Sequence, residues 1–211
     1  GNIQMKERWP EEARPGIELA EKGLFLLAVP FAAFYMMQFI FGGMPWEYSF
    51  SVALGNALCI GAVYYPLCAL TGRPVISGLI IVILAGVWGV ANYYIVQFRG
   101  NPILPWDLTA LQTAVAVSGS YHFSLTWRMV LALFLAGGLI ALMVCGRKRG
   151  GVRLHLRGAG RGIILACGLL CLGAASQIDN LKELGISADV WDQAKAYRES
   201  GILGAFLCNL E

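Results

Sequence analysis

The chain has 211 residues, of which 57% are hydrophobic and only 14% are charged, with a formal net charge of +3. Charged residues make up roughly a quarter of an ordinary soluble domain, so this composition excludes a typical soluble protein. It predicts an integral membrane protein, for which no nucleic-acid partner is expected.

Five apolar runs along the chain predict membrane spans. A helix needs about 20 apolar residues to cross the roughly 30 Å of hydrocarbon in a bilayer. Four of the runs reach or nearly reach this length, and the last is marginal. The predicted spans cover about residues 24–42, 50–70, 75–98, 129–146 and 162–177. The expected fold is therefore an all-α bundle of about five transmembrane helices.

The basic residues predict the orientation of this bundle. The connection between the fourth and fifth runs carries five arginines, one lysine and no acidic residue, and loops of this kind stay in the cytoplasm. With that loop inside, residues 1–23 form a cytoplasmic N-terminal segment and residues 24–178 form the transmembrane domain. Residues 179–211 then form an extracellular linker, with the C-terminus outside.

Polar residues are rare within the spans. A transporter or proton pump normally carries ionisable residues at membrane depth, and the spans contain none, so that class is disfavoured. The carboxamides of Gln38, Asn56 and Asn92 are expected to join helices by hydrogen bonds, with a substrate path as the alternative. Both histidines, His122 and His155, lie in loops. We therefore expect neither a catalytic nor a metal-binding residue on this chain.

The longest predicted outer connection joins the third and fourth spans, and it is too apolar for a free loop. Pro105 and Asp107 both suit the first turn of a helix, where proline is tolerated and the helix dipole favours an anion. We predict a short helix that lies in the outer membrane interface and ends near Gly119.

Arg99 lies where the third span leaves the membrane, and two interpretations of it are open. Its guanidinium can form two hydrogen bonds to a lipid phosphate. Alternatively, it pairs with Asp107 and folds the loop over the helix ends. The candidates for binding a lipid headgroup or for structuring the loop are Arg99, Asp107, Asn92, Trp106, Tyr121 and His122.

Two stretches carry a family resemblance. The first is NYYIVQFRGNPILPWDL (Asn92–Leu108), which is followed by GSYHFS (Gly119–Ser124). The second is the tail, AKAYRESGILGAFLCNLE (Ala194–Glu211). Together they resemble the membrane domain of the lipoteichoic acid synthase family, whereas the spans match it only as hydrophobic helices.

This resemblance implies a location and a function. Members of the family are phosphoglycerol transferases of the bacterial cell membrane that take part in cell wall biogenesis. Their extracellular sulfatase-like domain takes glycerol phosphate from phosphatidylglycerol through a threonine nucleophile beside a divalent metal, usually manganese. No stretch after Asn180 is long enough for such a domain. The chain is therefore expected to be the membrane anchor, with catalysis and manganese in a domain outside these residues.

The resemblance also implies partners and residue roles. Membrane lipids, phosphatidylglycerol among them, and the chain's own catalytic domain are the expected partners. The family's FRG-P-D pattern falls on residues that are expected to shape a lipid-facing vestibule, namely Phe98, Arg99, Gly100, Pro102 and Asp107. The alternative function is a stand-alone membrane scaffold or lipid-binding protein without catalysis.

Overall fold

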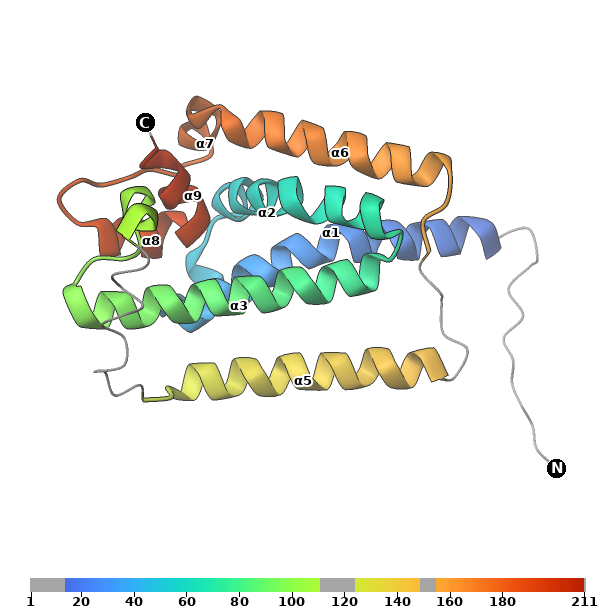
Figure 1. Ribbon diagram of the computed structural model, residues 1–211, viewed down its shortest axis with the longest axis horizontal. Helices are drawn as coiled ribbons and strands as arrows, with labels where there is room; N and C mark the ends of the chain where they lie inside the picture. Colours follow the sequence, from blue (N-terminus) through green and yellow to red (C-terminus); the bar gives the residue numbers. More distant parts are fainter. Residues whose placement is uncertain (1–13, 111–123, 149–154, 211) are drawn as a thin grey trace.

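The computed structural model describes residues 14–110, 124–148 and 155–210, and within these ranges it contains helices and no strand. The long helices are α1 (Arg14–Phe41), α2 (Phe50–Thr71), α3 (Pro74–Arg99), α5 (Trp127–Lys148) and α6 (Ala159–Ser176). The short helices are α7 (Ile178–Glu183), α8 (Gln193–Ser200), α9 (Ile202–Cys208) and two 3-10 helices, η2 (Pro45–Glu47) and η3 (Pro105–Ala110). Figure 1 shows the long helices running alongside one another, with α8 and α9 at one end.

Four of the described helices are long and apolar enough to cross a membrane. They are Leu19–Phe41 within α1, all of α2 and α3, and α6. The all-helical membrane class is thereby confirmed, and the marginal run at 162–177 lies in one of the four. The predicted span at 129–146 lies in α5, whose described apolar part, Trp127–Gly138, is shorter. A count of five crossings therefore remains a prediction.

The ends of α2 and α3 follow from local sequence. Ser49 precedes α2, and its hydroxyl accepts a hydrogen bond from the Val52 amide, as an N-cap residue does. Pro74 opens α3, where its missing N–H leaves no helical hydrogen bond unmade. Gly72 and Gly100 end the two helices with φ angles of 66° and 80°. Glycine is the residue that adopts this left-handed conformation without steric cost.

Glycines allow the long helices to pack closely. A Cβ atom on Gly89 of α3 would lie 2.9 Å from the Met37 carbonyl oxygen of α1. A Cβ atom on Gly168 of α6 would lie 2.5 Å from the Pro66 ring of α2. Both distances are too short for real Cβ contacts, so the helix backbones approach each other at these points. The bundle formed by α1, α2, α3 and α6 is therefore tightly packed.

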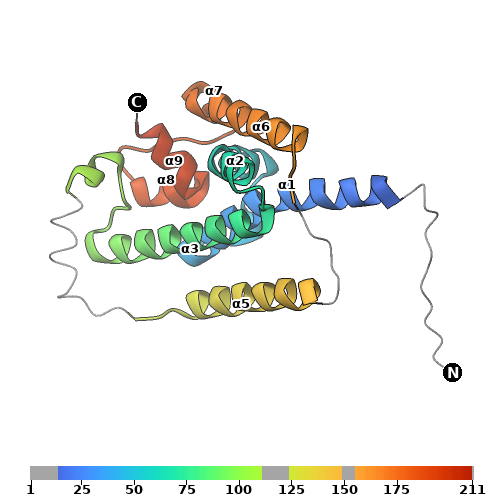
Figure 2. The same ribbon diagram turned by 45° about the vertical axis from the view of Figure 1, so that its right-hand side comes forward.

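α5 and α6 lie on opposite sides of the bundle (Figures 1 and 2). α5 contacts the rest of the bundle through its first turns, where Met129 and Ala132 are buried against Ile40 of α1. Farther along α5, Leu133 and Phe134 are 65% and 79% exposed. Exposed apolar side chains of this kind suit lipid-facing positions, so in the part of α5 whose side chains are described, the buried contacts with α1 lie in the first turns.

The two ends of the bundle carry different connections. At one end, the Leu156 amide donates a hydrogen bond of 3.0 Å to the Gly72 carbonyl oxygen, and the Arg161 side chain lies over Gly72. The α2–α3 turn and the end of the basic connection, which were predicted on the same side of the membrane, therefore meet. The outer loop and the tail lie at the opposite end. Which end faces the cytoplasm remains a prediction.

The contact at Gly89 gives a test of the packing. In Gly89→Ala, the new methyl group would force α1 and α3 apart, and we expect the free energy of unfolding to fall by about 1–3 kcal/mol. Unfolding in mixed detergent, followed by circular dichroism, measures the change. Gly137 of α5 has no neighbouring atom within 4 Å, so Gly137→Ala is expected to be neutral or stabilising. Equal destabilisation by both substitutions would contradict this packing.

Candidate functional site

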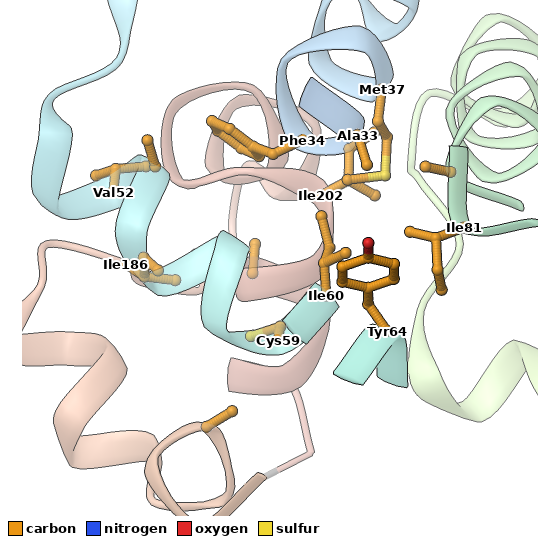
Figure 3. Packing of buried hydrophobic residues seen from close by; sticks show 14 of the residues in the cluster. Ala33, Phe34, Met37, Val52, Cys59, Ile60, Tyr64, Ile81, Ile186 and Ile202 are labelled. Atoms are coloured by element: carbon orange, nitrogen blue, oxygen red, sulfur yellow. The ribbon is translucent and has the colours of Figure 1, made fainter. Parts of the chain in front are cut away.

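Residues 178–210, which we call the C-terminal cap, fold onto one end of the bundle. Several of the cap's side chains are completely buried, namely Leu181, Ile186, Tyr197, Ile202 and Ala205. Figure 3 shows Ile186 and Ile202 in one cluster with side chains of α1, α2 and α3. The segment predicted as a linker is thus a folded part of the bundle. Its extracellular position remains a prediction.

Two carboxamides of the spanning helices hold the junction between α8 and α9. Gln38 of α1 donates through Nε2 to the Tyr197 carbonyl at 3.2 Å and accepts at Oε1 from the Ile202 amide at 2.9 Å. Asn56 of α2 donates through Nδ2 to the Ser200 carbonyl and accepts at Oδ1 from the Gly204 amide, both at 2.9 Å. Both carboxamides are fully buried.

These bonds satisfy backbone groups that a helix cannot satisfy itself. The last carbonyls of α8 and the first amides of α9 have no partner within their own helices. A carboxamide carries both a donor and an acceptor, so each side chain serves the end of one helix and the start of the next. Gly201 between the helices has a φ of 85°, and a Cβ there would lie 2.4 Å from Asn56. The junction therefore requires glycine.

The third carboxamide joins the outer loop to α3. Asn92 is fully buried, donates to the Trp88 carbonyl and accepts from the Ile103 amide, both at 2.9 Å. The Ile103 carbonyl in turn accepts from the Tyr197 hydroxyl at 2.9 Å. Burial raises the pKa of Tyr197, so its hydroxyl keeps the proton that it donates. The loop and the cap are thus bound to each other.

Arg99 is engaged with the loop that follows it. Its guanidinium donates to both carboxylate oxygens of Asp107 and to the carbonyls of Asn101 and Pro102. These bonds use four of its five N–H donors. The structure therefore contains the ion pair that one of the two interpretations anticipated, and it leaves one donor for a lipid phosphate.

Asp107 is held from two directions. Besides Arg99, the Leu104 amide donates to its carboxylate at 2.7 Å. The hydrogen bond from Arg99 lowers the pKa of this carboxyl, partial burial raises it, and the Leu104 amide lowers it further, so that the pKa lies below its ordinary value. Asp107 belongs to the first turn of η3, which begins at Pro105 as expected.

The other predicted site residues are separate from this network. Trp106 lies in η3 and is 56% exposed, so it faces away from the bundle. Tyr121 and His122 lie outside the described residues, as does the predicted continuation of the interfacial helix beyond Ala110. Of the six candidates, the structure brings Arg99 and Asp107 into direct contact and connects Asn92 to the same loop.

Sequence reasoning overlooked Arg128 at the start of α5. Its Nη1 donates to the carbonyls of Phe39 and Gly43 at 3.2 and 3.1 Å, at the end of α1. Its guanidinium carbon lies 5.2 Å from the ring centroids of both Phe39 and Trp127. A cation at the C-terminal end of a helix is favourable because the helix dipole is negative there. The sequence signal was an arginine beside a tryptophan at a predicted span end.

Comparisons of the chain with protein families, with curated proteins and with solved structures find no match. The likeness to lipoteichoic acid synthases therefore rests on the two stretches quoted above. By itself, this geometry fixes the positions of the outer loop and of the C-terminal cap. Three buried carboxamides and one ion pair hold the outer loop and the C-terminal cap at the same end of the bundle.

Replacing Asn56 by leucine tests the hold on the cap. The Ser200 carbonyl and the Gly204 amide would lose their partner, and leaving a buried polar group unsatisfied costs about 1–3 kcal/mol. Cys208 of α9 is only 6% exposed. In a variant with Cys208 as its single cysteine, we expect Asn56→Leu to speed maleimide labelling at least about fivefold. Gln97 of α3 is exposed, so Gln97→Leu should leave the rate unchanged. Equal rates in all three proteins would show that Asn56 does not hold the cap.

The lowered pKa of Asp107 gives a pH dependence. Because the folded pKa is depressed, the stabilisation is present at neutral pH and is lost as the pH falls through the folded value. We expect the loop to stay in place from pH 8 to 5 and to detach only below about pH 4. Emission from Trp106, as the sole tryptophan, reports the change. Asp107→Asn should already show, at pH 7, the Trp106 emission of the detached loop, and this emission should not change with pH. A transition above pH 5 is the result that rejects this account.

Proposed function

We propose that this chain is the membrane-anchoring domain of a lipoteichoic-acid-synthase-like phosphoglycerol transferase. The observation that carries the proposal is the contact between the two stretches that resemble the family. The Tyr197 hydroxyl, in the tail, donates to the Ile103 carbonyl, in the outer loop, and Tyr197 is completely buried. The two segments that carry the resemblance therefore act as one unit.

The anchor would position catalysis rather than perform it. A transferase domain joined after α9 would follow a helix whose first turn is bound by Gln38 and Asn56. It would be held at a defined height at the outer leaflet, where phosphatidylglycerol is its substrate. The divalent metal, manganese in this proposal, would lie within that domain. The stand-alone scaffold uses the same cap but needs no domain after it.

The proposed topology has five crossings, with the N-terminus in the cytoplasm of a bacterium and the C-terminus outside. Two observations support it. The α2–α3 turn and the end of the basic connection meet at one end of the bundle through Gly72 and Leu156, and positive loops favour the cytoplasmic side. α5 is a 22-residue helix that begins at the opposite end, beside α1. If it spans, the outer loop and the cap both face outward.

A chimera tests the proposal. The chain is joined at Glu211 to the extracellular domain of a lipoteichoic acid synthase and expressed in a bacterium that lacks its own synthase. We expect this chimera to restore the glycerol phosphate polymer, measured by immunoblot of cell extracts. Asn56→Leu in the chimera should lower polymer yield at least about threefold at equal protein level, because the cap no longer fixes the domain.

Two controls make the result specific. The same catalytic domain on an unrelated five-span anchor should restore less polymer, and equal polymer would reduce the chain to a simple tether. A phosphatase reporter at Glu211, active only outside the cytoplasm, checks the orientation. If the chimera is well expressed with its C-terminal domain outside but makes no polymer, the proposal of a transferase anchor is rejected. The stand-alone scaffold is then the function that stands.

A further inference from the structure

The α2–α3 turn and the start of α6 lie at the end of the bundle opposite the C-terminal cap (Figure 1), and they carry three exposed arginines. These are Arg73, Arg157 and Arg161, which we call the arginine patch. A hydrogen bond of 3.0 Å from the Leu156 amide to the Gly72 carbonyl joins the two segments. Arg157 and Arg73 follow this bonded pair in the chain, and a Cβ atom on Gly72 would lie 2.0 Å from the Arg161 guanidinium. The three arginines therefore gather where the turn meets α6.

Most donors of the arginine patch are unused within the described part of the chain. The Arg161 guanidinium donates from Nε to the Leu156 carbonyl at 3.2 Å, which leaves the four N–H groups of Nη1 and Nη2. The side chains of Arg73 and Arg157 donate no hydrogen bond to a described residue, although the Arg73 amide binds the Thr71 hydroxyl. The exposed guanidiniums are therefore available to a partner outside the chain.

The positive charge of the arginine patch is not neutralised by acidic neighbours. The segments that form it, residues 71–74 and 155–161, contain no Asp or Glu. In the described part of the chain, the ion pair formed is that of Arg99 and Asp107, at the opposite end. The first turns of α1, residues 14–22, hold two acidic and two basic residues and add no net charge. α6 has no acidic residue in its first turn and no side-chain cap, so its helix dipole adds positive potential.

The arginine patch directly borders the lipid-facing surface of the bundle. α2, α3 and α6 are all long and apolar enough to cross a membrane, and their exposed apolar side chains reach the patch. Leu70 and Ile163 are 78% and 63% exposed. Leu70 lies three residues before Arg73 and Ile163 two residues after Arg161, which is roughly 3–5 Å along a helix axis. An arginine at this depth keeps its alkyl stem with the apolar side chains and its guanidinium among the headgroups. The surface that faces the patch is therefore the membrane surface.

We propose that the arginine patch binds the anionic headgroups of the leaflet at this end of the bundle. Basic residues at a membrane surface attract anionic lipids, and guanidiniums bind phosphate through charge-assisted hydrogen bonds. The headgroups join the α2–α3 turn to the start of α6, because arginines of both segments contact the same lipid layer. In the topology proposed above this leaflet is the cytoplasmic one, away from the substrate of the transferase. The inference itself needs neither that orientation nor a catalytic domain, so its test is separate.

Lipid titration of the purified chain in a nonionic detergent, followed by native mass spectrometry, measures binding. The probes are dioleoylphosphatidylglycerol, which is anionic, and dioleoylphosphatidylcholine, which has no net charge. We expect the wild type to bind the anionic lipid at least about fivefold more tightly. The pair Arg73→Gln and Arg157→Gln should weaken binding of the anionic lipid at least about fivefold and leave that of phosphatidylcholine unchanged. The matched control, Lys195→Gln with Arg198→Gln, removes two exposed cations from the C-terminal cap and should stay within about twofold of wild type.

Two further measurements separate charge from a structural role. Arg73→Lys with Arg157→Lys keeps both charges and should bind the anionic lipid within about threefold of wild type. Raising the salt concentration should weaken binding of the anionic lipid to the wild type, because exposed charges are screened. Equal losses in the two glutamine pairs overturn the arginine patch as the site. Equal binding of both lipids to the wild type, which needs no variant to fold, also overturns the proposal and makes an acidic protein the partner to seek.

Discussion

The constraint on which this structure depends is that backbone N–H and C=O groups need partners where water is absent. Asn56 lies six residues into α2, roughly 9 Å below its start, and Asn92 lies seven residues from the end of α3, roughly 10 Å below it. Cap and loop backbone reaches these depths, where an unsatisfied group costs several kcal/mol. The buried carboxamides supply the partners, so an irregular segment can enter the bundle.

This hold couples elements that are far apart in the chain. α1 and α2 bind the junction of α8 and α9, α3 binds Ile103, and Ile103 binds Tyr197. At the cap's open end, Gln193 and Asn209 exchange two hydrogen bonds of 2.9 and 3.0 Å. A displacement of α9 would therefore break contacts with two spanning helices at once. The position of whatever follows the cap is set by the membrane helices.

Much of the fold could be predicted from sequence, and the site only in part. Apolar runs mark helices by their length, Pro74 marks the start of a helix because it lacks an N–H donor, and Gly72 marks an end because it adopts the left-handed conformation. All three signals are local. The pair of Arg99 and Asp107 lies eight residues apart and was foreseeable. Gln38 and Asn56 were expected to join helices by hydrogen bonds, and they do. Their particular partners, backbone groups of α8 and α9 more than 140 residues away, could not be predicted. The sequence does not show which backbone N–H or C=O groups a side chain will bind.

The choice of carboxamides explains the uncharged spans. A carboxylate at position 56 could accept from Gly204 but could not donate to Ser200, and its charge would be buried at high cost. An ammonium could donate to Ser200 but could not accept from Gly204, and its charge would be buried as well. Only a neutral group with both donor and acceptor serves the end of α8 and the start of α9 together. The scarcity of ionisable residues at depth, which argued against transport, is thus also what this way of holding the cap requires.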